Sequence, residues 1–214
     1  MNYTTFDTLT VRQYQQLYAI HSSEDKDLDK IIQSVCVLAD KTERQVEEMS
    51  LPDFNKVAGE LSVIFGKEVK GNPKSFINIA GDRYGIVYDP STLSAGQYIE
   101  IQTWMASNVI ENLNKIMASI VYRVTGRGIF KKRHKYDAAN HPAISEAILD
   151  CNFIDVHSTC VFFLKLWNAS IVSLEGYLAK ELRTKGVTRD QLRTILARSS
   201  VGFSTFADLP KIKE

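Results

Sequence analysis

A helix-start signature recurs along this chain and constrains its fold more than any other feature. Thr10 is followed three residues later by Gln13, and Ser94 is followed by Gln97 in the same way. In such a capping box each side chain accepts a hydrogen bond from the backbone N–H of the other residue. Two donors left free at a helix start are thereby satisfied. The signature therefore predicts helices that begin just after Thr10 and Ser94.

The two closest copies leave two interpretations open. Each has a leucine before the hydroxyl residue and a tyrosine after the glutamine, and looser copies begin at Thr42 and Thr188. An internal duplication would explain the match, but the residues that follow diverge, whereas long repeats usually match over more of their length. The other interpretation, which we favour, is that the signature marks where helices begin.

Apolar residues spaced by threes and fours predict helices over most of the chain. Two stripes are long. One runs from Ala95 to Val124, which would span ~45 Å at 1.5 Å per residue, and the other runs from Val156 to Leu182. Because amphipathic helices of matching period can pack along their length, we expect a mostly α fold, a helical bundle with these two helices as its spine. Shorter helices are expected over residues 11–20, 28–38, 51–66, 142–151 and 189–198.

Residues 75–88 interrupt the helical pattern. Phe76–Ile79 and Tyr84–Tyr88 are apolar and rich in β-branched and aromatic residues, and Ala80–Arg83 between them favours a turn. This pattern predicts an inserted β-hairpin with a four-residue turn. An isolated hairpin is marginal in water, so it must pack on helices or pair with a partner's strand. The length of 214 residues suits a single helical domain, residues 1–214.

Composition argues against several classes of protein. The formal net charge of +1 is unsuited to bulk electrostatic binding of nucleic acid or membrane. No apolar stretch approaches the ~20 residues of a membrane span, and the first residues do not form a signal peptide. The spacing of the three cysteines fits neither a disulfide framework nor a zinc site. We expect thiols in a reducing compartment and no membrane partner.

Candidate catalytic chemistry is sparse in this sequence. None of the four histidines has metal-binding spacing, so we expect no metal ligand. Asp150, Asp155 and His157 are neighbours, but no nucleophile motif accompanies them. We therefore expect no catalytic residue, no bound cofactor and no enzymatic activity.

Two segments are candidate interaction sites. The first is a basic loop over residues 123–136, and the second is an extended C-terminal tail over residues 199–214. The loop could contact phosphates through charge alone, remain solvated, or face an acidic patch on a neighbouring subunit. The tail's apolar residues could fold back onto the chain's own core or dock on another subunit. The residues concerned are Arg127, Lys131, Lys132, Arg133 and Lys135 in the loop, and Phe203, Phe206 and Leu209 in the tail.

Several of these segments together resemble the tail-assembly and ring or neck proteins of tailed bacteriophages, including crAss-like phages. The segments are 9–14, the helix with Ile31 and Ile32, the turn 48–54, the hairpin leading into 93–100, and Phe162 with Phe163. The resemblance implies a small, non-enzymatic helical protein that acts through protein contacts. It would be made in the host cytoplasm and placed in the virion, as a homo-oligomeric ring that contacts other tail, neck or portal proteins.

Two alternatives to a ring subunit stay open. A tail-assembly chaperone would bind its partner transiently and be absent from the mature virion. A DNA-contacting accessory protein would use the segment from Arg127 to Lys135 for contacts that do not depend on DNA sequence.

Overall fold

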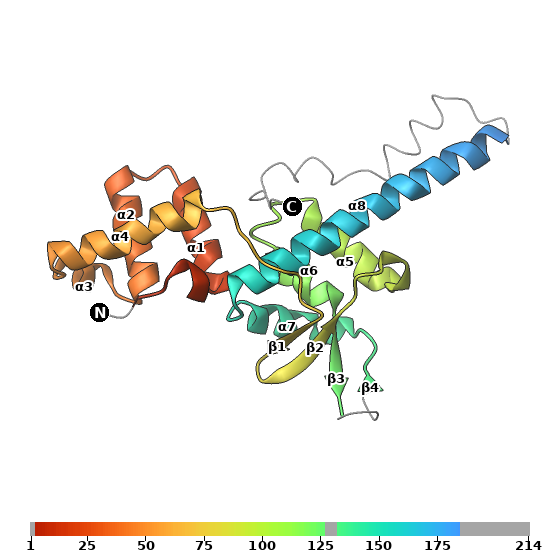
Figure 1. Cartoon of the computed structure of the whole chain (residues 1–214), viewed down its shortest axis with the longest axis horizontal. Helices are drawn as coiled ribbons and strands as arrows, with labels where there is room; N and C mark the ends of the chain where they lie inside the picture. The colour runs from red at the N-terminus through yellow and green to blue at the C-terminus, as the bar shows by residue number, and fades with distance from the viewer. Residues whose placement is uncertain (1–2, 127–131, 185–214) are drawn as a thin grey trace.

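The computed structural model describes residues 3–126 and 132–184, with side chains up to residue 170. Helices dominate these residues and one small sheet accompanies them (Figure 1), so the predicted mostly helical class is confirmed. The helices are α1 (Val11–Ser22), α2 (Asp27–Ala39), α3 (Glu43–Glu47), α4 (Leu51–Gly66), α5 (Ala95–Met105), α6 (Leu113–Ile120), α7 (His141–Ile148) and α8 (Phe153–Thr184). The strands are β1 (Phe76–Ile79), β2 (Asp82–Ile86), β3 (Val121–Thr125) and β4 (Lys132–Arg133).

Three of the predicted capping boxes are confirmed. Thr10, Thr42 and Ser94 cap α1, α3 and α5, and each exchanges hydrogen bonds with the glutamine three residues later. In the third box the Gln97 N–H donates to Ser94 Oγ over 3.3 Å, and the Ser94 N–H donates to Gln97 Oε1 over 3.0 Å. The looser copy at Thr188 lies outside the described residues.

The described residues form two lobes that meet at the first residues of α8. The N-terminal lobe, residues 3–66, consists of α1 to α4, and the C-terminal lobe holds the sheet with α5 to α8 (Figure 1). At the junction the rings of Tyr14 and Phe153 stack with centroids 3.7 Å apart. A backbone hydrogen bond also links the two lobes here, because the Phe153 N–H donates to Leu9 O over 2.7 Å. The buried apolar side chains of both lobes form one continuous core.

The predicted helix from Ala95 to Val124 is wrong. The structure divides it into α5, an irregular segment, α6 and strand β3. Within the irregular segment Asn108 Oδ1 accepts the backbone N–H of Ile110 over 3.0 Å, a local bond that competes with helix. The apolar spacing misled because both helices bury their stripes in the same core, including Met105, Leu113 and Ile116. One of the two expected long helices is therefore replaced by shorter elements.

The single inserted hairpin is corrected to a four-stranded antiparallel sheet in the order β1-β2-β3-β4. Its first hairpin lies where the sequence placed it, but the turn has two residues, Ala80 and Gly81, rather than four. Both have positive φ, 49° and 84°, as a type I′ hairpin turn requires. The segment expected to be a basic loop, 123–136, supplies part of β3 and all of β4.

The remaining long helix, α8, has 32 residues, packs against α6, and continues beyond the rest of the C-terminal lobe (Figure 1). The expected helix 189–198 and the C-terminal tail with Phe203, Phe206 and Leu209 lie outside the described residues. Among the described helices, none combines the length and the apolar character needed to cross a lipid bilayer.

Candidate functional site

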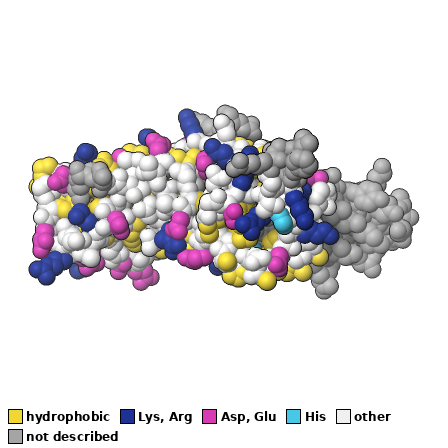
Figure 2. Space-filling view, turned by 90° about the horizontal axis from the view of Figure 1, so that it is seen from below, with side chains coloured by type: hydrophobic (Ala, Val, Ile, Leu, Met, Phe, Trp, Pro, Cys, Tyr) yellow, Lys and Arg dark blue, Asp and Glu magenta, His cyan; other side chains and the backbone are white. Residues whose placement is uncertain are grey.

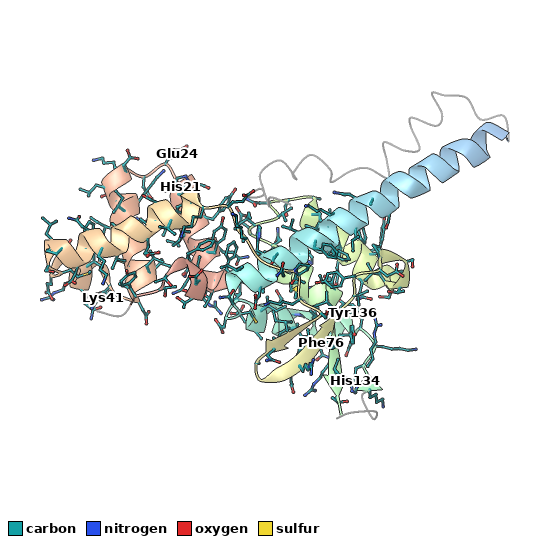
Figure 3. All side chains as sticks on the ribbon, in the orientation of Figure 1. His21, Glu24, Lys41, Phe76, His134 and Tyr136 are labelled. Carbon is teal, nitrogen blue, oxygen red and sulfur yellow. The ribbon has the colours of Figure 1, made fainter. Side chains whose placement is uncertain are left out.

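The predicted basic residues that the structure describes lie on the second hairpin of the sheet. Lys132 and Arg133 form β4, and Lys135 follows it; all three side chains are exposed. Arg127 and Lys131 belong to residues 127–131, which the structure does not describe. Figure 3 shows Phe76, His134 and Tyr136 on the sheet side of the C-terminal lobe, far from His21 and Lys41 in the N-terminal lobe.

Strand pairing gathers aromatic and arginine side chains on one face of the sheet. Phe76 pairs with Gly85 and Gly85 with Tyr122, so these residues share a face. Because side chains alternate along a strand, Arg83, two residues before Gly85, lies on this face too. Arg133 belongs to the same face because it pairs with Val124, which lies two residues after Tyr122. We call this surface the arginine–aromatic face; its members are Phe76, Arg83, Tyr122 and Arg133.

Each arginine of this face is stacked on an aromatic ring. The Arg83 guanidinium carbon lies 4.0 Å from the Phe76 ring centroid, and that of Arg133 lies 4.0 Å from the Tyr122 centroid. This geometry is a cation–π contact. Among the described residues neither guanidinium has a carboxylate partner. Each guanidinium therefore lies over a ring, and its N–H groups have no acidic partner among the described residues.

The opposite face of the sheet is electrostatically different. Its arginine, Arg123, is neutralised by Asp82 through an ion pair of 2.7 Å. The hydrogen bond that Arg123 donates to that carboxylate raises the pKa of Arg123. Among the described residues, Arg83 and Arg133 thus share the arginine–aromatic face without an acidic partner, whereas Lys132, which pairs with Thr125, lies on the opposite face. Figure 2 shows Lys and Arg side chains gathered beside a histidine on the side of the molecule that holds the sheet.

A glycine makes the Tyr122 position possible. A Cβ atom on Gly85 would lie 2.3 Å from Tyr122 Cζ, far inside van der Waals contact. The ring therefore rests directly on the backbone of Gly85, with Arg133 on it.

Replacing Gly85 with alanine is expected to destabilise the fold by ~1–3 kcal/mol, because the ring must move out of a packed position. Urea unfolding followed by circular dichroism measures the loss. The matched control is Gly59→Ala in α4, where nothing lies within 4 Å of the new Cβ. There we expect a gain of up to ~1 kcal/mol from helix propensity. A Gly85→Ala variant as stable as the wild type would contradict the close packing.

Two clefts flank the segment that follows β4. One, of about 460 Å³, lies between the sheet and α7, and the other, of about 490 Å³, lies beside the start of α5. Four side chains line both: Tyr122, His134, Lys135 and Tyr136. The volumes are in the range of small-molecule sites. The four shared residues are basic or aromatic, but the cleft beside α7 is also lined by Asp82 and Asp137.

At these clefts lies a polar cluster made by the half-buried Glu100 and Tyr136 and the buried Ser119 and His141. The Tyr136 hydroxyl donates to Glu100 Oε2, and Ser119 Oγ lies 3.1 Å from His141 Nε2. Burial, reinforced by Glu100, raises the pKa of Tyr136, so this hydroxyl stays protonated. The cluster ties α5, α6 and the start of α7 to the segment after β4.

The cluster has the residue types of a Ser–His–acid triad but a different geometry. In a triad the histidine uses one ring nitrogen for the serine and the other for the acid. Here the same atom, His141 Nε2, faces Ser119, the carbonyl of Lys115 at 3.0 Å and Glu100 Oε2 at 3.7 Å. Ser119 is also fully buried. The arrangement therefore positions helices and offers no nucleophile to a substrate.

The sequence identified one of the four members of the arginine–aromatic face, Arg133, through the charge run. Tyr122 was missed because residues 121–124 were predicted to be helical, and Phe76 and Arg83 were assigned only to the predicted hairpin. The signal that could have found Tyr122 is the composition of residues 121–125, where four of the five residues are β-branched or aromatic, as is typical of a strand. The polar cluster around His141 was missed because its members lie far apart in the sequence.

Among the described side chains, no group of three or more His, Cys, Asp or Glu residues could hold a metal ion. Burial raises the pKa of the Cys160 thiol, which disfavours the reactive thiolate. Comparison of the chain with known protein families, with curated proteins and with solved structures finds no match.

Proposed function

We propose that this chain is a non-enzymatic structural protein of a tailed-phage virion, a subunit of a ring in the portal–tail neck or the tail. The observation that carries the proposal is a pair of exposed apolar surfaces on different lobes. Exposed apolar side chains that cluster mark protein contacts. The resemblance of the helix-start segments to phage ring and neck proteins agrees with it.

The first apolar surface lies between α2 and α4 in the N-terminal lobe. Leu28, with 63% of its side chain exposed, and Ile31 stand one turn apart on α2. Ile31, Leu61 and Phe65 line a shallow groove of about 270 Å³. We call this the α2–α4 surface.

The second surface lies on α5, beside α8 in the C-terminal lobe. Ile99 is 63% exposed, and the neighbouring Tyr98 packs its ring 5.0 Å from the ring of Trp167 on α8. This α5 surface consists of Tyr98 and Ile99. The two surfaces lie toward different ends of the described fold, where α2 and α5 are labelled in Figure 1.

Two different surfaces suit a head-to-tail contact, in which the α2–α4 surface of one copy meets the α5 surface of the next. Such heterologous contacts generate a ring when the rotation closes. The tail with Phe203, Phe206 and Leu209 would add to the contact between copies or to the contact with portal and tail proteins. The geometry of the His141 cluster supports the non-enzymatic part of the proposal.

The test uses two charge substitutions, Leu28→Asp on the first surface and Ile99→Asp on the second, with native mass spectrometry as the readout. We expect the wild type to form a closed ring and each variant to be monomeric. A mixture of the two variants should form a dimer and nothing larger, because one intact surface of each kind remains. Leu51→Asp, at an exposed leucine outside both surfaces, is the matched control and should still form rings.

A strictly monomeric wild type that is also absent from purified virions would reject the ring. If each variant alone formed dimers, a symmetric contact would replace the head-to-tail one. The tail-assembly chaperone is the alternative function. It predicts the chain in infected cells bound to a tail protein, and no chain in mature particles by mass spectrometry.

A further inference from the structure

We propose that the arginine–aromatic face binds the backbone of nucleic acid, without reading its sequence. This inference does not depend on ring formation, because it rests on one face of one subunit. The proposed site is not the basic loop expected from the sequence, residues 123–136. Three of its four members, Phe76, Arg83 and Tyr122, lie outside that segment.

Stacking prepares the two guanidinium groups for phosphate. Arg83 and Arg133 are exposed, yet the guanidinium carbon of each lies over an aromatic ring, 4.0 Å from its centroid. A planar guanidinium presents paired N–H donors that match two oxygens of one phosphate. Because the rings already limit the side-chain rotamers, less conformational entropy is lost when the phosphate is bound.

The strand register places the two arginines at one level of the sheet. Tyr84 pairs with Arg123, so one step further along the ladder Arg83 lies opposite Val124, which pairs with Arg133. The two arginine backbones are thus two strand spacings apart, or ~10 Å. Lys135 follows β4, whereas Lys132 pairs with Thr125 and lies on the opposite face, and residues 121–135 contain no acid. The positive charge is local, since the whole chain carries a formal charge of only +1.

The character of the face favours nucleic acid over an acidic protein. Protein interfaces have an apolar core surrounded by a polar rim. Here an arginine lies over each aromatic ring, Phe76 is 39% exposed, and the aliphatic member at their level, Val124, is half-buried. What the face offers is planar cations, which are the groups that contact phosphates in nucleic-acid complexes.

The experiment measures fluorescence anisotropy of labelled single-stranded and duplex DNA oligonucleotides titrated with the full chain over a series of salt concentrations. The wild type should bind, and its affinity should fall as salt rises, because counterions are released on binding. The double variant Arg83→Gln/Arg133→Gln should lose affinity. The slope of log affinity against log salt, which is negative, should become shallower by about 2.

A charge-matched control removes two cations from the N-terminal lobe, as Lys41→Gln/Arg44→Gln, and should bind like the wild type. The variant Arg83→Lys/Arg133→Lys keeps the charge but loses the planar fork, so it should keep the salt slope and bind more weakly at every salt concentration. Circular dichroism melting checks that each variant is folded.

Three results would overturn the proposal. The first is no binding of the wild type to either oligonucleotide at low salt. The second is equal loss in the control pair, which would indicate attraction by net charge alone. The third is binding of polyglutamate, but not DNA, in a manner that needs Arg83 and Arg133, which would assign the face to an acidic protein. A lysine variant that binds like the wild type would overturn the role of the stacked planes.

Discussion

Phe153→Ala is expected to lower the free energy of unfolding by ~3–5 kcal/mol, the range observed when a large buried aromatic side chain is removed from a core. Phe153 is fully buried at the junction of the two lobes, and its ring stacks on Tyr14 with centroids 3.7 Å apart. An aromatic pair of this kind contributes beyond the area it buries. Urea unfolding followed by circular dichroism measures the change.

The same helix supplies a matched control. Phe162 is also a phenylalanine of α8, but 39% of it is exposed, and its ring makes a T-shaped contact with that of Tyr88, with centroids 5.2 Å apart. Phe162→Ala should therefore cost less than ~1 kcal/mol. Equal losses at the two positions would contradict the assignment of Phe153 to the core that joins the lobes.

The second large effect is a loss of stability in mild acid that depends on His157. This side chain is fully buried, neither ring nitrogen has a hydrogen-bond partner among the described residues, and burial lowers its pKa from 6.5 to about 4. In the unfolded chain the imidazole takes up its proton near pH 6.5. Between pH 6.5 and 4 the unfolded state thus binds more protons than the folded state, so a falling pH favours unfolding.

The contribution of the neutral His157 to the free energy of unfolding is fully present above pH 6.5 and is lost as the pH falls toward 4. At 1.36 kcal/mol per pH unit, the loss is roughly 2 kcal/mol at pH 5 and roughly 3 kcal/mol at pH 4. Unfolding curves of the wild type and of His157→Leu across this range measure it. The carboxylates are the same in both proteins, so the difference between them isolates His157. Parallel pH profiles would contradict a neutral, buried imidazole.

The places where helices and the first hairpin begin could be predicted from the sequence alone. A capping box is a set of bonds between residues three apart, such as Thr10 and Gln13, so it depends on no distant contact. The turn at Ala80 and Gly81 is equally local, although the expected turn was two residues too long at its C-terminal end, where Asp82 and Arg83 belong to β2. Apolar periodicity likewise identified buried positions such as Met105 and Ile116, because α5 and α6 both turn their apolar residues toward one core.

The break between α5 and α6, and the change to strand at Val121, were decided by tertiary structure. Residues 121–125 continue a helical spacing, but pairing with β2 satisfies their backbone groups in extended form. The arginine–aromatic face exists for the same reason, since Arg83 and Arg133 come together only when β2, β3 and β4 align.

What the sequence determined by itself is therefore everything held by hydrogen bonds within a few residues: the helix starts, the first hairpin and the spacing of the apolar stripes. What only the tertiary structure decided is the sheet and the surface on it. Its contacts join residues as far apart as Asp82 and Arg123, 41 positions along the chain. Local propensity carries no information about such pairs, because their free energy is gained only when the chain folds back on itself.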